Sequence, residues 1–284
     1  MTTNISKRHA LIGFALAVSG VLNPAQAGSG ASDWSDGLHA KTRLVTAGPR
    51  DAETWRAGIQ IRLDPGFKTY WRTPGSSGVP PVFDFSQSRN LKAAKVLFPA
   101  PVYFPDGVDK AIGYKHEVIL PVAVQPQDPA MPVDLVLKMD YAVCEKLCVP
   151  VQAGVMLTVT AKGVFDQTIA DQLAGFEARV PKPAAVGGPG SLAILDVQGN
   201  DPGNYLVKLR APQGATPQIF VEGQTGWYFD ISGGEADGDA RRYTLKLAEK
   251  PSSENSAKTS VLLTVATPDQ AIETQVTLPV SAKQ

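Results

Sequence analysis

Cysteine and histidine are scarce in this 284-residue sequence, which limits the chemistry that it can support. The chain has only two cysteines, Cys144 and Cys148, and three histidines. A closed zinc site needs four ligands of these kinds, so the composition argues against one. Cys-His nucleophilic catalysis is also disfavoured, because His116 lies between Lys115 and Glu117 and has the features of a solvated strand start. We expect no cofactor.

The sequence also lacks long apolar runs and an excess of either charge. Its N-terminal apolar run, residues 10–22, has about 13 residues, and a bilayer span needs roughly 20. This run follows Lys7 and Arg8 and precedes Ala25-Gln26-Ala27, the layout of a secretory signal peptide over residues 1–27. Its removal leaves 25 Lys and Arg against 27 Asp and Glu, which argues against a nucleic-acid partner. We therefore expect a secreted protein in an oxidising space, such as a bacterial periplasm, that does not span the membrane.

The region from 28 to 163 is rich in short β-type runs that proline and glycine interrupt. Alternation is clearest at 57–63, where Ala57, Ile59 and Ile61 share one face. Short strands separated by turns indicate an antiparallel sandwich of the immunoglobulin type. The expected strands are 40–47, 54–63, 82–85, 93–98, 117–124, 133–141 and 151–161.

The pattern changes between residues 164 and 191. Apolar residues spaced by four, three and four, from Ile169 to Val180, predict one amphipathic helix with Asp166 as its N-cap. Pro181 ends this helix. The proline- and glycine-rich segment 183–190 then predicts a linker, since neither regular element tolerates that composition.

Residues 192–284 return to the β pattern and hold no cysteine. We predict a second sandwich, with no recognisable catalytic cluster, that serves as a partner-binding or spacer module. The fold class is therefore all-β: two immunoglobulin-like β-sandwich domains joined by a short helix and a Pro/Gly linker. The expected strands of the second sandwich are 191–197, 205–211, 218–222, 227–231, 243–247, 260–266 and 273–280.

The two cysteines are the strongest candidates for chemistry, because only three residues separate them. A ring of about five residues stabilises a fold by roughly 2 kcal/mol, against roughly 3 kcal/mol for a fifteen-residue loop, so a purely structural disulfide would serve better between distant strands. Tight spacing instead suits thiol-disulfide exchange, in which the second thiol resolves a mixed disulfide. Lys146 favours a thiolate and Glu145 opposes one, so the sequence leaves the nucleophile open.

Two other interpretations of the cysteine pair stay open. Both thiolates, with Met139, Met156 or His116, offer soft ligands for Cu(I), although the methionines are more simply core residues of the flanking strands. Alternatively, the chain is a non-catalytic β-sandwich binding module with a structural disulfide.

Two aromatic stretches precede the cysteines. Residues 66–81 suggest core rings beside a long loop, and 98–114 suggest a long connection. A reactive pair in an oxidising compartment needs shielding, and an aromatic loop can provide a lid over it. Asp106, Asp109 or Glu117 could also supply a proton acceptor near the thiols. The candidate cap or supporting residues are Tyr103, Phe104, Asp106, Asp109, Tyr114 and Tyr141.

Several motifs in a fixed order give the chain a family resemblance. They are Tyr70-Trp71-Arg72-Thr73-Pro74-Gly75, Phe98-Pro99-Ala100-Pro101, Gly113-Tyr114 with Leu120-Pro121-Val122, and Asp140-Tyr141-Ala142-Val143-Cys144-Glu145-Lys146-Leu147-Cys148-Val149-Pro150. Over about residues 35–162 the sequence resembles the periplasmic N-terminal domain of the DsbD family of thiol:disulfide interchange proteins, which has relatives linked to copper tolerance.

This resemblance implies an immunoglobulin-like sandwich that acts as a thiol:disulfide oxidoreductase of the protein-disulfide reductase type. Its cysteine pair would receive electrons from a membrane thiol carrier and pass them to periplasmic thioredoxin-like partners. Cys144 and Cys148 match the redox pair, and residues 98–116 fall where the family has a cap loop.

The sequence departs from the family pattern in two ways. The best-known members have a longer cysteine spacing and an acidic, aromatic cap segment that has no residue-by-residue match here, so that acidic role is not assigned to Asp106 or Asp109. The membrane and thioredoxin domains of full-length members have no counterpart either, which implies a stand-alone form with an unknown electron donor.

Overall fold

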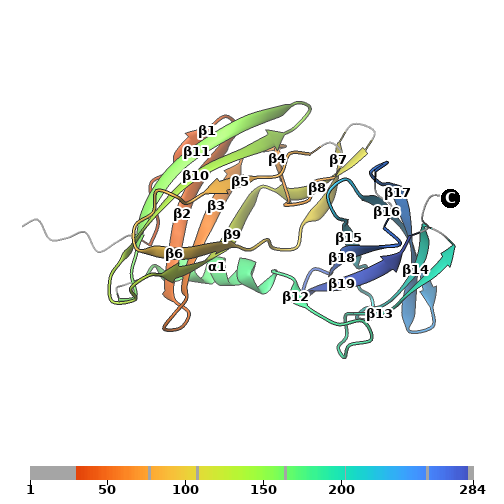
Figure 1. Ribbon diagram of the computed structural model, residues 1–284. Helices are drawn as coiled ribbons and strands as arrows, with labels where there is room; N and C mark the ends of the chain where they lie inside the picture. Colours follow the sequence, from red (N-terminus) through yellow and green to blue (C-terminus); the bar gives the residue numbers. More distant parts are fainter. Residues whose placement is uncertain are drawn as a thin grey trace, which may run out of the picture.

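The computed structural model describes residues 30–280, except 76–77, 107–108, 163–164, 202 and 254–255. Within this part, the chain forms two β-sandwiches with one helix beneath the first (Figure 1). The predicted fold class is confirmed. The predicted signal peptide lies outside the described residues, and the domain limits 28–163 and 192–284 stay predictions. None of the described helices is long and apolar enough to cross a membrane.

The first sandwich consists of two mainly antiparallel sheets that enclose one apolar core. Alternation explains the layers: in β11, for example, Val151, Ala153, Val155 and Leu157 are buried, and the residues that alternate with them are exposed. One sheet has the order β1 (Ser35–Gly37), β2 (Ala40–Pro49), β3 (Trp55–Leu63), β9 (Glu117–Pro126), β6 (Leu91–Val96). The other has the order β11 (Cys148–Val159), β10 (Val133–Cys144), β4 (Lys68–Tyr70), β8 (Asp109–Lys115), β7 (Val102–Asp106), and β5 (Val82–Asp84) also pairs with β10.

The expectations for the stretches 66–81 and 98–114 are partly wrong. Both contain strands: β4 lies in the first, and the second contains β7 and most of β8, which form a hairpin. Short length and proline hid these strands, since β4 has only three residues and Pro105 interrupts the aromatic run. Both Met139 and Met156 were predicted to be core residues. Met139 is buried in the core, as predicted, but the prediction for Met156 is wrong: it is 63% exposed because it falls on the outer face of β11.

One helix, α1 (Gln167–Ala178), covers the sheet that contains β2 and β9. Asp166 is its N-cap, as predicted, and accepts hydrogen bonds from the amides of Thr168 and Ile169. Ile169 and Leu173 pack against Val45 of β2 and against β9, so the helix buries the apolar face that its spacing predicts. The predicted pattern runs to Val180, two residues beyond the end of the observed helix.

The second sandwich packs one sheet against the first sandwich. Its sheets have the orders β12 (Lys182–Pro183), β19 (Ala271–Pro279), β18 (Lys258–Ala266), β15 (Gln218–Glu222) and β13 (Ala193–Asp201), β14 (Asn204–Arg210), β17 (Ala240–Glu249), β16 (Tyr228–Asp237). Phe220, Ala266 and Ala271 belong to the same apolar cluster as the core of the first sandwich. The predicted linker is also held in place, because Arg210 donates hydrogen bonds to the carbonyl oxygens of Gly188 and Gly190.

Candidate functional site

The cysteine pair closes the hairpin between β10 and β11. Cys144 is the last residue of β10 and Cys148 the first of β11; the two are opposite each other in the ladder and form a disulfide. Their Cα atoms are 4.2 Å apart. Cys144 is buried, with 3% of its surface exposed, whereas Cys148 is exposed. The two cysteines therefore differ in access, which the sequence alone did not indicate.

Tyr70 of β4 places its hydroxyl group beside both sulfur atoms. Its oxygen lies 3.1 Å from Cys144 Sγ and 2.9 Å from Cys148 Sγ. Strand pairing fixes this position, because Lys68 lies opposite Cys144 and the Thr69 hydroxyl donates to the carbonyl oxygen of Ala142 at 2.9 Å. A phenol that donates a hydrogen bond to a thiolate stabilises its charge. Sequence reasoning missed this residue, although the motif that begins at Tyr70 was a signal.

Phe104 of β7 covers the buried side of the pair. It is 2% exposed and forms a small apolar cluster with Tyr70, Ala111, Ala142 and Cys144. The ring centroids of Phe104 and Tyr70 are 6.2 Å apart. Of the candidate cap residues whose side chains are described, Phe104 is therefore the one that packs beside the disulfide.

The hairpin that carries Phe104 approaches β4 so closely that β8 needs a glycine. A Cβ atom on Gly113 would lie 1.9 Å from the carbonyl oxygen of Thr69. Any larger residue would push β8 and β4 apart. The Gly113-Tyr114 motif therefore has a local structural reason.

The other predicted aromatic residues lie away from the sulfurs. Tyr103 donates to the carbonyl oxygen of Ile219 in the second sandwich (2.7 Å), Tyr114 donates to that of Pro99 (2.7 Å), and the Tyr141 hydroxyl bonds to that of Thr42 (2.8 Å). Burial raises the pKa of Tyr103 to about 12, that of Tyr114 well above its usual range and that of Tyr141 above its ordinary value. These phenols stay protonated at neutral pH.

Of the three acidic residues predicted as proton acceptors, only Glu117 has a described side chain, and it does not contact the sulfurs. Asp106 and Asp109 pair at the tip of the β7–β8 hairpin, but their side chains lie outside the described residues. Glu117 instead accepts hydrogen bonds from Gln60 and from Arg62 Nε (3.1 Å), in the other sheet.

Two lysines, Lys68 and Lys146, lie next to the cysteines in the ladder and in the turn, and Glu145 also lies in that turn. Lys68 lies opposite both Cys144 and Lys115 in the ladders, and Lys146 is exposed in the turn between the cysteines. Among the described residues, no carboxylate forms an ion pair with any of the three. Lys68 also lies over the Phe104 ring, with its Nζ 5.2 Å from the ring centroid. The lysines favour a thiolate over a thiol, and Glu145 opposes it.

The structure does not assemble the soft ligands of a Cu(I) site. Met139 lies five residues before Cys144 on the same strand, roughly 16 Å away at the usual rise per residue. Within the described ranges, no group of three or more His, Cys, Asp or Glu side chains could hold a metal ion.

Two comparisons with known proteins concern the part of the chain that contains the cysteine hairpin. Residues 39–160 match the family model of the N-terminal region of the thiol:disulfide interchange protein DsbD. The crystal structure of the N-terminal periplasmic domain of ScsB from Proteus mirabilis is 19% identical, superposes with a TM-score of 0.66, and covers 90% of this chain and all of its own.

Two further comparisons add nothing to the assignment. A marsupial T cell receptor covers 84% of this chain and 96% of its own at 10% identity, but its TM-score of 0.21 is too low to indicate a common fold. No curated protein matches the chain in sequence. The family match covers the cysteine hairpin, β4 and the β7–β8 hairpin, so the similarity of this chain to the DsbD N-terminal domain extends over residues 39–160.

Proposed function

We propose that this protein is a periplasmic thiol:disulfide interchange protein, which relays electrons through Cys144 and Cys148. The donor would be a membrane thiol carrier of the DsbD type, and the acceptors periplasmic thioredoxin-like proteins. One observation carries the proposal: the cysteine pair forms a disulfide with one accessible cysteine, one buried cysteine and a hydroxyl group at both sulfurs. The family match of residues 39–160 supports the same chemistry.

The exposed residue, Cys148, supports an order of events. A thiolate of the donor attacks Cys148 Sγ, the Cys144–Cys148 bond breaks, and Cys144 leaves as a thiolate that Tyr70 stabilises. The second thiolate of the donor then attacks its own sulfur in the mixed disulfide and releases the Cys148 thiolate. Two electrons have moved, since the donor is now a disulfide and the pair is a dithiol.

The oxidative half of the cycle runs through the same atoms. The Cys148 thiolate attacks one sulfur of the acceptor disulfide, and the other acceptor sulfur leaves as a thiolate. Cys144, deprotonated, then attacks Cys148 Sγ, which restores the internal disulfide and releases the acceptor as a dithiol. Burial of Cys144 suits it to this resolving role, because it reaches Cys148 but not a separate protein.

A redox titration tests whether the pair exchanges at all. The protein is equilibrated with glutathione or dithiothreitol buffers, and the free thiols are counted by alkylation and mass. We expect a midpoint above about −300 mV, within reach of cellular thiol carriers. A pair that stays oxidised well below that potential is a structural disulfide, which would overturn the proposal.

Single-cysteine variants test which sulfur meets the partners. Cys144→Ser leaves the exposed thiol and is expected to trap mixed disulfides with thioredoxin-like proteins in periplasmic extracts. The matched variant Cys148→Ser leaves only the buried thiol and is expected to trap few. Equal trapping by both variants would contradict the assigned order.

A further inference from the structure

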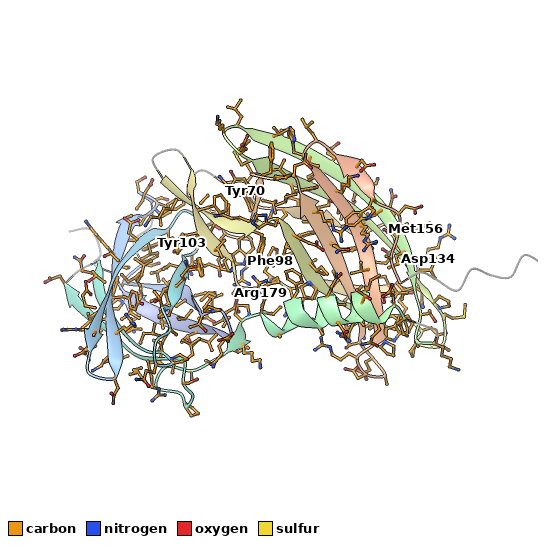
Figure 2. The ribbon with its side chains drawn as sticks, turned by 180° about the vertical axis from the view of Figure 1, so that it is seen from behind. Tyr70, Phe98, Tyr103, Asp134, Met156 and Arg179 are labelled. Atoms are coloured by element: carbon orange, nitrogen blue, oxygen red, sulfur yellow. A yellow bond between two sulfur atoms is a disulfide. The ribbon has the colours of Figure 1, made fainter. Side chains whose placement is uncertain are left out.

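Phe220 of the second sandwich lies under both segments that surround the disulfide. Its ring centroid is 4.7 Å from that of Tyr103, in a stacked arrangement, and 5.8 Å from that of Trp71. The side chain is fully buried, although it comes from an outer sheet face of the second sandwich. Figure 2 shows Tyr103 at the junction of the two sandwiches, with Tyr70 toward the first.

Neighbouring residues of these segments face opposite ways. Tyr70 contacts the sulfurs and the next residue, Trp71, contacts Phe220. In β7, Phe104 packs with Cys144, whereas the preceding residue, Tyr103, stacks on Phe220. Successive side chains of extended chain alternate between faces, so a contact made on one face fixes the side chain on the other.

Polar contacts hold the same segments to the second sandwich. Arg72 donates to Glu222 at 2.6 Å and also to Glu273, and the Thr73 hydroxyl donates to Glu222 at 2.6 Å. Burial lowers the pKa of Arg72, but hydrogen bonds and charge attraction to both carboxylates outweigh it and raise the pKa above its ordinary value. Arg72 therefore stays charged and paired at any physiological pH.

The first sandwich supports the two segments unequally. β4 has only three residues but pairs with both β10 and β8, whereas β7 is the edge strand of its sheet and has β8 as its one strand partner. An edge strand with one partner opens more easily than a central strand. The second sandwich packs against the edge strand β7 and against Trp71, the residue that follows β4.

We infer that the second sandwich positions Tyr70 and Phe104 against the cysteine pair, with Phe220 as the positioning residue. This inference rests on the proposed redox function and assigns the second sandwich a role in it. Without Phe220, the segments 68–73 and 102–104 keep their sequence but lose the surface that fixes them, so the Tyr70 hydroxyl leaves the sulfurs for part of the time.

The test compares Phe220→Ala with Phe229→Ala in the full chain. Phe229 is the control, because it is half-buried against the core of the second sandwich, on the other sheet. In Phe220→Ala we expect amide hydrogen exchange at 68–71 and 102–104 to rise about tenfold or more, because the substitution removes the ring contacts with both Tyr103 and Trp71. The thiol pKa of the reduced protein, read from the pH profile of alkylation, should also rise. Phe229→Ala should change neither.

A double variant separates positioning from general loosening. In a Tyr70→Phe background the hydroxyl is already absent, so Phe220→Ala should raise the thiol pKa no further. Should Phe220→Ala fail to fold, Tyr103→Phe removes only the bond to Ile219 and should still raise exchange at 102–104. Unchanged exchange there overturns the inference, as does a wild-type thiol pKa in Phe220→Ala.

Failure of the proposed function would look different from failure of this inference. A pair that exchanges with no partner would give a very low midpoint in the redox titration, whereas amide exchange and thiol pKa would still report whether Phe220 positions the segments.

Discussion

The Tyr70 hydroxyl group lies within hydrogen-bond distance of both sulfur atoms of the disulfide. Tyr70→Phe removes that group and keeps the ring that packs on Phe104. A hydrogen bond to a charged group contributes about 1.5 to 3 kcal/mol, so its loss should raise the thiol pKa of the reduced protein by about one to two units. The pH dependence of iodoacetamide alkylation measures this pKa.

Tyr114→Phe is the control for that substitution. It also deletes one buried phenolic oxygen from a neighbouring strand, but that oxygen bonds to Pro99. The thiol pKa should stay at the wild-type value. An equal rise in both variants would mean that the Tyr70 hydroxyl has no special relation to the sulfurs.

Leu147, at the tip of the cysteine turn, is 80% exposed and is the most exposed large apolar residue of the described chain. A partner that reaches Cys148 must pass beside it, and burial of a leucine contributes about 1.5 to 3 kcal/mol. Leu147→Asp should therefore slow exchange with a thioredoxin-like protein about tenfold or more, while reduction by dithiothreitol is unchanged.

Met131→Asp provides the comparison for Leu147. Met131 is 57% exposed but precedes β10, whose other end carries Cys144. Stopped-flow fluorescence of the partner gives both rates. If both substitutions slow the partner equally, charge rather than docking at the turn explains the effect.

Helix α1 illustrates how local sequence sets one element. Asp166 accepts two amide hydrogen bonds at its start. Asp166→Ala should lower the free energy of unfolding by about 1 kcal/mol. Urea denaturation followed by circular dichroism measures the loss, and Asp171→Ala, on the exposed side of the same helix, should change it by less than about 0.5 kcal/mol. Equal losses would show that the cap is not the cause.

Elements with a strong local pattern were predictable, and those that depend on distant partners were not. The strands β3 and β10 and the helix cap follow from alternation and capping residues. β4 and the β7–β8 hairpin escaped because their pairing depends on β10 and on one another rather than on their own sequences.

The candidate site was predictable to the same extent. Spacing pointed to Cys144 and Cys148, and the aromatic composition pointed to Phe104. The role of Tyr70 and the different exposure of the two cysteines depend on the ladder between β4 and β10, which no local signal encodes. Tyr103 lies in the aromatic stretch that was predicted to cover the cysteines, but its side chain faces the second sandwich. Neighbouring side chains of a strand point to opposite faces, so Tyr103 and Phe104 cannot both face the cysteines.

At the scale of the whole molecule, the two sandwiches share an interface that mixes apolar and ionic contacts. Phe220, Ala266 and Ala271 join the core of the first sandwich, and Arg72 pairs with Glu222 and Glu273 close by. Side chains in these pairs are only 13 to 27% exposed. We therefore expect the sandwiches to unfold together, in one calorimetric transition.

Arg72→Met should separate that transition into two. The variant keeps an apolar stem but leaves two largely buried carboxylates of the second sandwich without their cation, at a cost of about 3 kcal/mol that falls mainly on the interface. Arg56→Met breaks a similarly buried pair with Glu177, which joins only the first sandwich and its helix. It should lower the melting temperature and keep a single transition. A single transition in Arg72→Met as well would mean that the apolar contacts around Phe220 are sufficient to couple the two sandwiches.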